Sequence, residues 1–148
     1  MAVPQRLQGR TPQLLTGALL SAVCVLANAH PPQAERRWHN CALFETRVTC
    51  VVDGDTFWFE GEKMRLLTVD TPEQDARCVK ERAVASAATD LLVRLLSNGS
   101  ITITRHGIDP YGRTLVTVDG SGGSIGQTLL DQGVAEHFGA RPRIDWCQ

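Results

Sequence analysis

The sequence lacks the features that identify several common classes of protein. It has no C-x-x-C pair and no histidines at a paired spacing, which argues against a zinc site. It has no uncharged apolar run of about 20 residues, the length that a membrane-spanning helix needs. It also has no excess of basic residues, since 15 Lys and Arg stand against 16 Asp and Glu. The overall charge of the chain therefore does not favour binding to long nucleic acids. Any contact between the protein and a nucleic acid should be local.

The first 29 residues differ from the rest of the chain. The whole sequence of 148 residues, with 43% hydrophobic and 21% charged residues, is typical of one folded domain. Its start has Arg6 and Arg10, then a mostly apolar run at 14–26, then Ala27 and Ala29 where a signal peptidase reads small residues. We expect residues 1–29 to be a cleaved signal peptide, although an uncleaved anchor is the alternative. The protein should then be periplasmic or secreted, without stable membrane association, and a monomer.

Four cysteines follow the expected cleavage site. An even number in an exported chain indicates two disulfide bonds, and three pairings are possible. We favour Cys41–Cys50, which would close a short loop, and Cys78–Cys147, which would hold the C-terminal tail. The other two pairings stay open at this point.

Strand-forming residues alternate with turn signals through much of residues 47–119. After a polar and loose lead-in at 30–46, the first three runs should form an antiparallel meander. Pro72 prevents the third run from continuing, because proline lacks the backbone donor that a strand uses. The residues from 105 to 112 should form a loop. The predicted strands are 47–53, 56–60, 63–69, 100–104 and 113–119.

Two helices are expected. Apolar residues repeat with a period of 3.6 over 79–97, on a face with Val79, Ala83 and Ala87 at its start and leucines at its end. Ser124 and Gln127 form a capping box that opens a shorter helix. The order of elements predicts an α+β protein dominated by β structure, with an OB-fold domain over 47–148. In this fold a five-stranded barrel has the long helix between strands three and four.

Acidic residues gather at the predicted strand ends, where they should repel one another. A calcium ion would relieve that repulsion, because it binds carboxylate and carbonyl oxygens. Asp55 and Asp70 could each offer a carboxylate, and Thr71 its backbone carbonyl. Asp53 is expected to cap its own turn through its side chain, and Asp75 to be a helix-entry residue or a solvated loop acid.

Three further residues would complete a site for phosphodiester hydrolysis. Glu73 could accept the proton of an attacking water as a general base. Arg65 and Arg113 could bind phosphate oxygens and stabilise the negative charge that develops there. In this interpretation the positive charge of Arg65 is directed at the substrate and not at the neighbouring acids. The alternative for the whole set is a surface cluster of salt bridges.

Three segments, VVDGDTFWF, MRLLTVDTPE and DPYGRTLVTV, resemble the signature blocks of the staphylococcal nuclease (thermonuclease) family. The resemblance covers about residues 48–138. It implies an OB-fold barrel that cleaves DNA and RNA with calcium. Tyr111, in the Y-G-R motif, falls where a contact with phosphate is suggested, although it could equally pack the turn. The remaining carried-over positions are Asp55, Asp70 and Thr71 as calcium ligands, Glu73 as general base, and Arg65 and Arg113 as phosphate-binding residues.

The chain also departs from the family pattern. The family has tyrosines that pack against the nucleotide after a GLA segment, whereas this chain has GVAEHFGAR, with His137 and Phe138. Two hypotheses follow. The first is an exported calcium-dependent nuclease that hydrolyses DNA and RNA with little sequence preference. The alternative is a non-catalytic OB-fold module that binds nucleic acid or oligosaccharide. A nuclease that works without calcium or with another metal is a third possibility.

Overall fold

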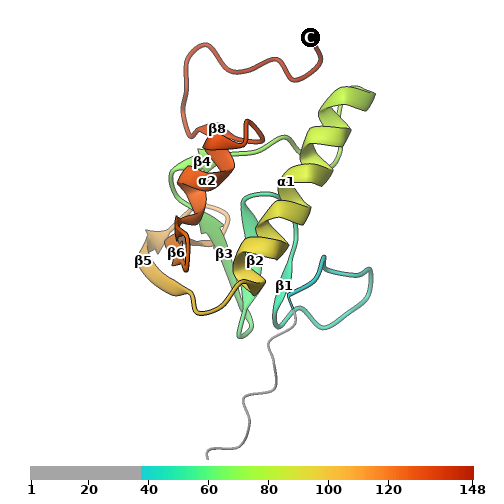
Figure 1. The fold of residues 1–148 in the computed structure, drawn as a ribbon. Helices are drawn as coiled ribbons and strands as arrows, with labels where there is room; N and C mark the ends of the chain where they lie inside the picture. The colour runs from blue at the N-terminus through green and yellow to red at the C-terminus, as the bar shows by residue number, and fades with distance from the viewer. Residues whose placement is uncertain (1–37) are drawn as a thin grey trace, which may run out of the picture. The chain divides into compact units, whose positions relative to one another are not determined.

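The computed structural model describes residues 38–148. The expected signal peptide and residues 30–37 of the lead-in lie outside the described residues. The described part consists of a six-stranded mixed sheet, a second sheet of two strands, and two helices (Figure 1). Within it no helix combines the length and the apolar character needed to cross a membrane.

The larger sheet has the strand order β1-β2-β3-β6-β5, with β7 paired to β6. Neighbouring strands are antiparallel, except that β3 and β6 run parallel. In the smaller sheet β4 pairs with β8. The strands are β1 (Cys50–Val51), β2 (Thr56–Phe59), β3 (Glu62–Leu66), β4 (Val69–Asp70), β5 (Thr102–Ile108), β6 (Thr114–Gly120), β7 (Gly123–Ser124) and β8 (Glu136–His137).

The predicted antiparallel meander is confirmed by β1, β2 and β3. Two details of the strand prediction were wrong, and a third is not confirmed. The run 63–69 divides into β3 and β4, which belong to different sheets. The expected loop at 105–112 begins late, because β5 continues to Ile108 through a bulge between Arg105 and Gly107. The closed five-stranded barrel is not confirmed, since β1 and β5 are the two ends of the sheet order in the described residues.

The lead-in is more ordered near its end than we expected. The Cys41 N–H donates to the Val51 carbonyl at 2.7 Å, and the Val51 N–H donates to the His39 carbonyl at 2.8 Å. Trp38 is buried, with its ring stacked on Phe59 at 5.7 Å between centroids. Residues 38–41 therefore extend the sheet edge and cover one side of the core.

The long helix α1 (Val79–Ser97) has the predicted bounds. Its buried face was predicted correctly only in its second half, where Leu92 and Leu96 enter the core. In the first half, Val79 is 83% exposed and Ala85 and Ala88 are buried instead. The reason is visible in Figure 1, where the first turns of α1 extend beyond the sheet. An apolar residue there has no core to enter.

The shorter helix α2 (Ile125–Asp131) begins at the predicted cap, with the Ser124 hydroxyl accepting the Gln127 N–H at 3.3 Å. The capping box is only half formed, because the Gln127 amide donates to Asp131 at 2.8 Å. Both helices contribute to one hydrophobic core against the sheet. Its largest fully buried members include Phe57, Met64, Leu66, Leu92, Leu96, Ile125 and Leu129.

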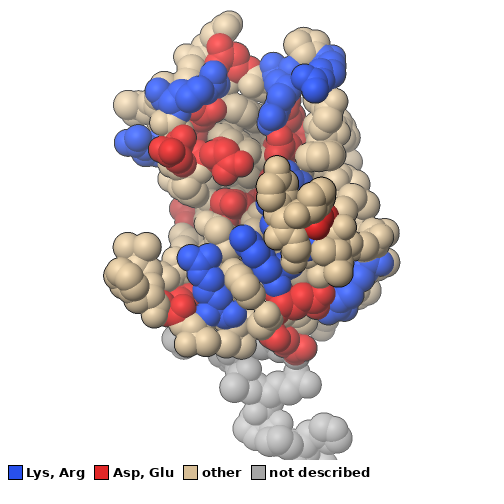
Figure 2. All heavy atoms as spheres, turned by 180° about the vertical axis from the view of Figure 1, so that it is seen from behind, with Lys and Arg blue, Asp and Glu red and all other residues tan. Residues whose placement is uncertain are grey.

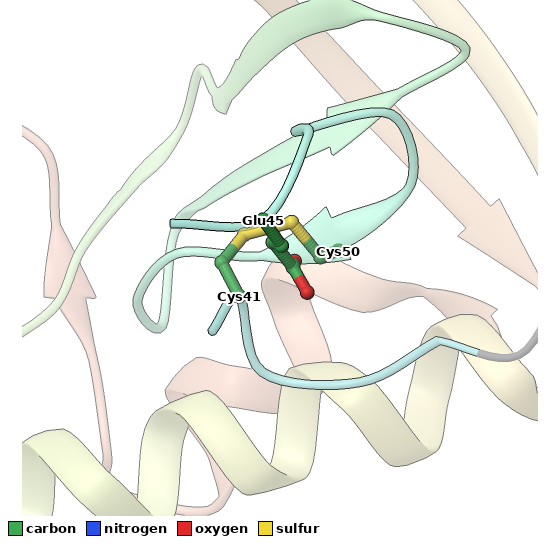
Figure 3. Close-up of side chains that lie close together, drawn as sticks. All are labelled: Cys41, Glu45 and Cys50. Atoms are coloured by element: carbon green, nitrogen blue, oxygen red, sulfur yellow. A yellow bond between two sulfur atoms is a disulfide. The ribbon is translucent and has the colours of Figure 1, made fainter. Parts of the chain in front are cut away.

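Both favoured disulfide pairings are present: Cys41–Cys50 and Cys78–Cys147. Figure 3 shows the first bond beside Glu45. Since the sulfur atoms are bonded to each other, neither cysteine pair offers thiolates to a metal ion. The second bond joins the residue that caps α1 to the C-terminal tail across 69 positions. It therefore keeps the tail next to the loop that follows β4.

Candidate active site

The D-G-D turn between β1 and β2 brings one acid into the interior. The Asp53 carboxylate accepts the N–H groups of Asp55 at 3.1 Å and Thr56 at 2.8 Å, so Asp53 caps the turn as predicted. Gly54 is buried against α1, where an added Cβ would lie 2.5 Å from the Ala88 Cβ and 2.8 Å from the Thr71 hydroxyl. Only glycine fits this close approach. The turn can therefore pack against α1 and Thr71 while Asp55 enters the site.

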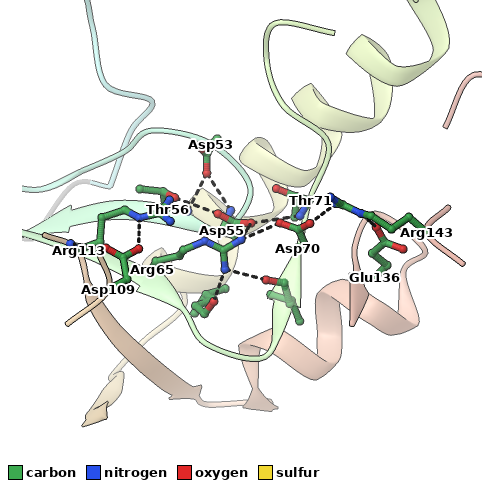
Figure 4. A network of polar contacts seen from close by, with 12 residues as sticks. Asp53, Asp55, Thr56, Arg65, Asp70, Thr71, Asp109, Arg113, Glu136 and Arg143 are labelled. Atoms are coloured by element: carbon green, nitrogen blue, oxygen red, sulfur yellow. Dashed lines mark hydrogen bonds and ion pairs between the residues drawn. The ribbon is translucent and has the colours of Figure 1, made fainter. Parts of the chain in front are cut away.

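Arg65 joins Asp55 to Asp70 at the centre of the site (Figure 4). Its Nη2 atom lies 3.2 Å from the Asp55 carboxylate and 2.7 Å from that of Asp70. Its Nη1 atom donates to the carbonyls of Leu66 and Val69, and the side chain is only 8% exposed. From the sequence we expected this charge to be directed at the substrate. In the structure it faces the two acids, because β3 and β4 fold around the guanidinium.

Asp55 is held by hydrogen bonds on both oxygens. It accepts the Thr56 hydroxyl at 2.9 Å and the Thr71 N–H at 3.1 Å. Burial, and then the charge of Asp53, raise its pKa to about 6, although Arg65 and these hydrogen bonds act in the opposite direction. Burial also raises the pKa of Asp53. Burial therefore disfavours the charged form of both carboxylates, and a nearby cation would favour it.

Asp70 has a second arginine partner that the sequence analysis missed. One Asp70 oxygen contacts Arg65, and the other contacts the guanidinium of Arg143 in the C-terminal tail. Arg143 also pairs with buried Glu136 at 2.9 Å. The signal that could have revealed Arg143 is its place four residues before Cys147, which the favoured disulfide would draw toward residue 78.

Glu73 is exposed, and it lines a cavity of about 560 Å³. Its lining residues come from the loop after β4, from the start of α1 and from the tail, including Arg143 and Trp146. The negative charge of Glu73 is close enough to contribute to the raised pKa of Asp53. Asp75 is an exposed loop residue, and the cap of α1 is Cys78 instead. The structure therefore places Glu73, and not Asp75, beside the acidic cluster.

Arg113 lies at the opposite end of the network from Arg143 (Figure 4). Its Nε pairs with Asp109 at 2.7 Å, and the same Asp accepts the backbone N–H groups of Tyr111 and Arg113. Its guanidinium carbon lies 5.4 Å from the centre of the exposed Tyr111 ring. Asp109 thus shapes the Y-G-R turn and holds Arg113, and none of the bonds in the described residues joins Arg113 to Asp55 or Asp70.

One aromatic side chain contacts the acidic cluster, and a second lines the adjoining cavity. The Phe138 ring is exposed and lies 5.0 Å from the guanidinium carbon of Arg65. Trp146 lies in the tail and lines the cavity, while Trp58 is half-buried in β2. Of His137 and Phe138, Phe138 is therefore the one in contact with the cluster.

The fold and the cluster define a small α+β protein with an acidic site bridged by arginine. The family model described as "Staphylococcal nuclease homologue" matches residues 63–145, more than half of the chain. The chain belongs to the staphylococcal nuclease family.

Two curated relatives have the same printed name, "Uncharacterized endonuclease". One comes from Escherichia coli O157:H7 and the other from Escherichia coli. Each is 30% identical over 100 residues, which is 64% of this chain and 61% of the relative. The chain thus spans about three fifths of the length of these relatives.

Proposed function

We propose that this protein is a nuclease that hydrolyses phosphodiester bonds in DNA and RNA with calcium and with little sequence preference. The observation that carries the proposal is the convergence of Asp55 and Asp70 on one nitrogen of Arg65, with Glu73 on the adjoining cavity. Membership of the nuclease family and the printed name of the relatives support it. The sheet order suits an OB-fold barrel opened between β1 and β5, which we propose as the parent fold.

The donor atoms of the cluster fit a calcium ion. Asp55 and Asp70 are oxygen donors that already share one positive group. Burial, and then the charge of Asp53, raise the pKa of Asp55, and a bound cation would favour its carboxylate form. Asp55, Asp70 and the carbonyl of Thr71 would hold the ion, with water completing its shell. When bound, calcium supplies positive charge that stabilises the phosphate and makes a neighbouring water more acidic.

The remaining chemistry is assigned to side chains of the chain. Glu73 is exposed to the cavity and accepts the proton of the attacking water at its carboxylate. Arg113, held by Asp109, donates to phosphate oxygens and stabilises the charge that develops as the bond breaks. Arg65 holds Asp55 and Asp70 in position and adds positive charge beside the phosphate. Tyr111, which borders Arg113, is proposed to contact the substrate.

The proposal includes an exported, monomeric protein. Two disulfide bonds favour an oxidising compartment, such as the periplasm or the external medium. On the face shown in Figure 2, Lys and Arg side chains alternate with Asp and Glu instead of forming one basic surface. Contacts with the polynucleotide should therefore be few and local.

The test is digestion of single-stranded DNA and of RNA by the purified protein, with calcium or with a chelator. We expect cleavage only with calcium, and a loss of about 10²- to 10⁴-fold in Glu73→Gln, because its amide cannot accept the proton. Asp75→Asn is the matched control, since Asp75 is an exposed acid in the same loop. Cleavage with chelator would refute the calcium requirement.

A second function has its own supporting observation. Arg65 and Arg113 are both paired with acids of the protein, as they would be in a module that binds a ligand without turnover. This alternative predicts saturable binding of oligonucleotide or oligosaccharide and no products with either additive. Full activity of Glu73→Gln in calcium would contradict the proposed mechanism without favouring the binding module.

A further inference from the structure

Arg143 is placed where the acidic cluster meets the cavity. Its guanidinium contacts Asp70 and pairs with Glu136 at 2.9 Å, and both acids are largely buried. Its own side chain is 58% exposed and lines the same cavity as Glu73. Arg143 is therefore held by two largely buried acids, while much of its own side chain remains accessible to a ligand.

The tail that carries Arg143 is attached to the body at several successive residues. The Ile144 N–H donates to Glu136 at 2.9 Å, and Asp145 pairs with Arg77 at 3.2 Å. Cys147 is bonded to Cys78 at the start of α1. Glu136 is itself fixed, because β8 pairs it directly with Asp70 of β4. These contacts hold residues 143–147, here called the tail strap, at a defined distance from Asp70.

The contact between Arg143 and Asp70 uses a carboxylate that the proposed function assigns to calcium. A divalent cation on Asp70 would weaken the attraction between that carboxylate and Arg143. Glu136 and the tail strap would still keep the guanidinium at the cavity. An arginine has five donors in a planar fork, which suits a phosphate group. In a chain without excess basic residues, such a local cation matters more than overall charge.

We propose that Arg143 binds a phosphate of the polynucleotide at the cavity and that the tail strap positions it there. Arg143 is thus a substrate-binding residue in addition to Arg113. It forms a phosphate subsite whose cationic group comes from the C-terminal tail and is tethered by Glu136 and by the Cys78–Cys147 bond. The inference rests on the proposed function, because the phosphate belongs to the same substrate.

The first experiment measures binding without turnover, in the full chain carrying Glu73→Gln. The probe is a short single-stranded oligo-dT with calcium, and fluorescence anisotropy is recorded over a series of salt concentrations. Adding Arg143→Gln should weaken binding about tenfold. It should also lower the slope of log affinity against log salt by about 0.7, the change expected when one phosphate contact to a single strand is lost.

The control is Arg141→Gln, which removes the same charge from an exposed position two residues away. It should change affinity less than about twofold and leave the salt slope nearly unchanged. Equal losses in both variants would mean a general charge effect and would overturn the inference. An unchanged salt slope in Arg143→Gln would overturn it as well.

A second measurement distinguishes two roles of Arg143, binding of the substrate and holding of the acidic side chains in position. Calorimetry with calcium chloride alone should show equal or tighter calcium binding in Arg143→Gln, because a positive charge next to Asp70 has been removed. In Arg143→Gln the affinity for DNA should therefore fall while the affinity for calcium stays equal or rises. If calcium binding weakens together with DNA binding, Arg143 only holds the acids in place, and the subsite is refuted.

The tether is tested with Cys147→Ser, which leaves Cys78 able to cap α1 through its sulfur. In a double-mutant cycle, the loss of affinity caused by Arg143→Gln should fall from about tenfold to about twofold once the strap is released. The same tenfold loss in both backgrounds would refute the role of the disulfide.

These outcomes are distinguishable from failure of the proposed function. If the wild-type protein cleaves DNA and Arg143→Gln has an unchanged KM and salt slope, the nuclease assignment stands and the subsite is wrong. If the wild-type protein binds oligo-dT without cleaving it and Arg143→Gln lowers the slope, the subsite stands and the nuclease assignment is wrong.

Discussion

Replacing Asp55 with asparagine should stabilise the calcium-free protein at neutral pH and reduce its response to calcium. Asp55 is buried, and its pKa rises from 3.8 to about 6. A carboxyl whose pKa is higher in the folded state stabilises the fold while it is protonated. That contribution is complete below about pH 3.8 and is lost as the pH rises through about 6.

The size of the effect follows from the pKa. The rise of the Asp55 pKa from 3.8 to about 6 corresponds to about 3 kcal/mol, which comes first from burial and then from the repulsion of Asp53. Asparagine keeps the shape and removes the buried charge, while Arg65 retains Asp70 and two carbonyls as partners. We expect Asp55→Asn to raise the free energy of unfolding by about 1 to 3 kcal/mol at pH 7 and by little at pH 4.

The assay is urea unfolding of wild type, Asp55→Asn and the exposed control Asp75→Asn, at pH 4 and pH 7 with chelator. The series is repeated at pH 7 with saturating calcium, where the wild type should gain stability by mass action and Asp55→Asn should gain less. A variant that is less stable than the wild type at pH 7 with chelator would refute the argument from burial. Equal stabilisation of both proteins by calcium would refute Asp55 as a ligand.

Three further predictions concern the turn, the phosphate site and the core. Gly54→Ala should cost about 1 to 3 kcal/mol, because its Cβ would lie 2.5 Å from that of Ala88, whereas Gly122→Ala, with open space around it, should change the urea midpoint little. Arg113→Ala should lower kcat about 10²- to 10³-fold with an unchanged circular dichroism spectrum, and full activity would exclude it from the site. Leu92→Ala should cost about 2 to 5 kcal/mol of stability by leaving a cavity, yet retain activity at temperatures where it stays folded.

Features that depend on neighbouring residues could be predicted from the sequence. Asp53 caps its turn with N–H groups only two and three positions away, so the D-G-D motif is sufficient to specify it. The bounds of α1 follow from the apolar repeat and from the stop at Asn98 and Gly99, where Gly99 has a positive φ of 85°. In these cases the interacting groups are brought together by the local backbone alone.

Features that depend on contacts between a helix or strand and distant parts of the chain were predicted less well. The apolar period of α1 identified a helix, but Val79 is exposed because no part of the sheet reaches the first turns. The run 63–69 has strand composition throughout, yet it divides where the Leu67 N–H bonds to β6 and the Thr68 carbonyl accepts from Phe138. A strand pattern specifies an extended backbone without specifying its partner.

The candidate site shows the same division between local and long-range information. Residue type and spacing were sufficient to predict Asp55, Asp70, Thr71 and Glu73 as site residues. The chemical groups that they offer depend on the residue type alone. The partner of each charge was decided only by tertiary packing. Arg65 faces the acids at the point where the chain passes from β3 to β4, and Arg143 contacts Asp70 although the two are 73 positions apart. Electrostatic interactions depend on distance and burial in space, and neither quantity exists until the chain has folded.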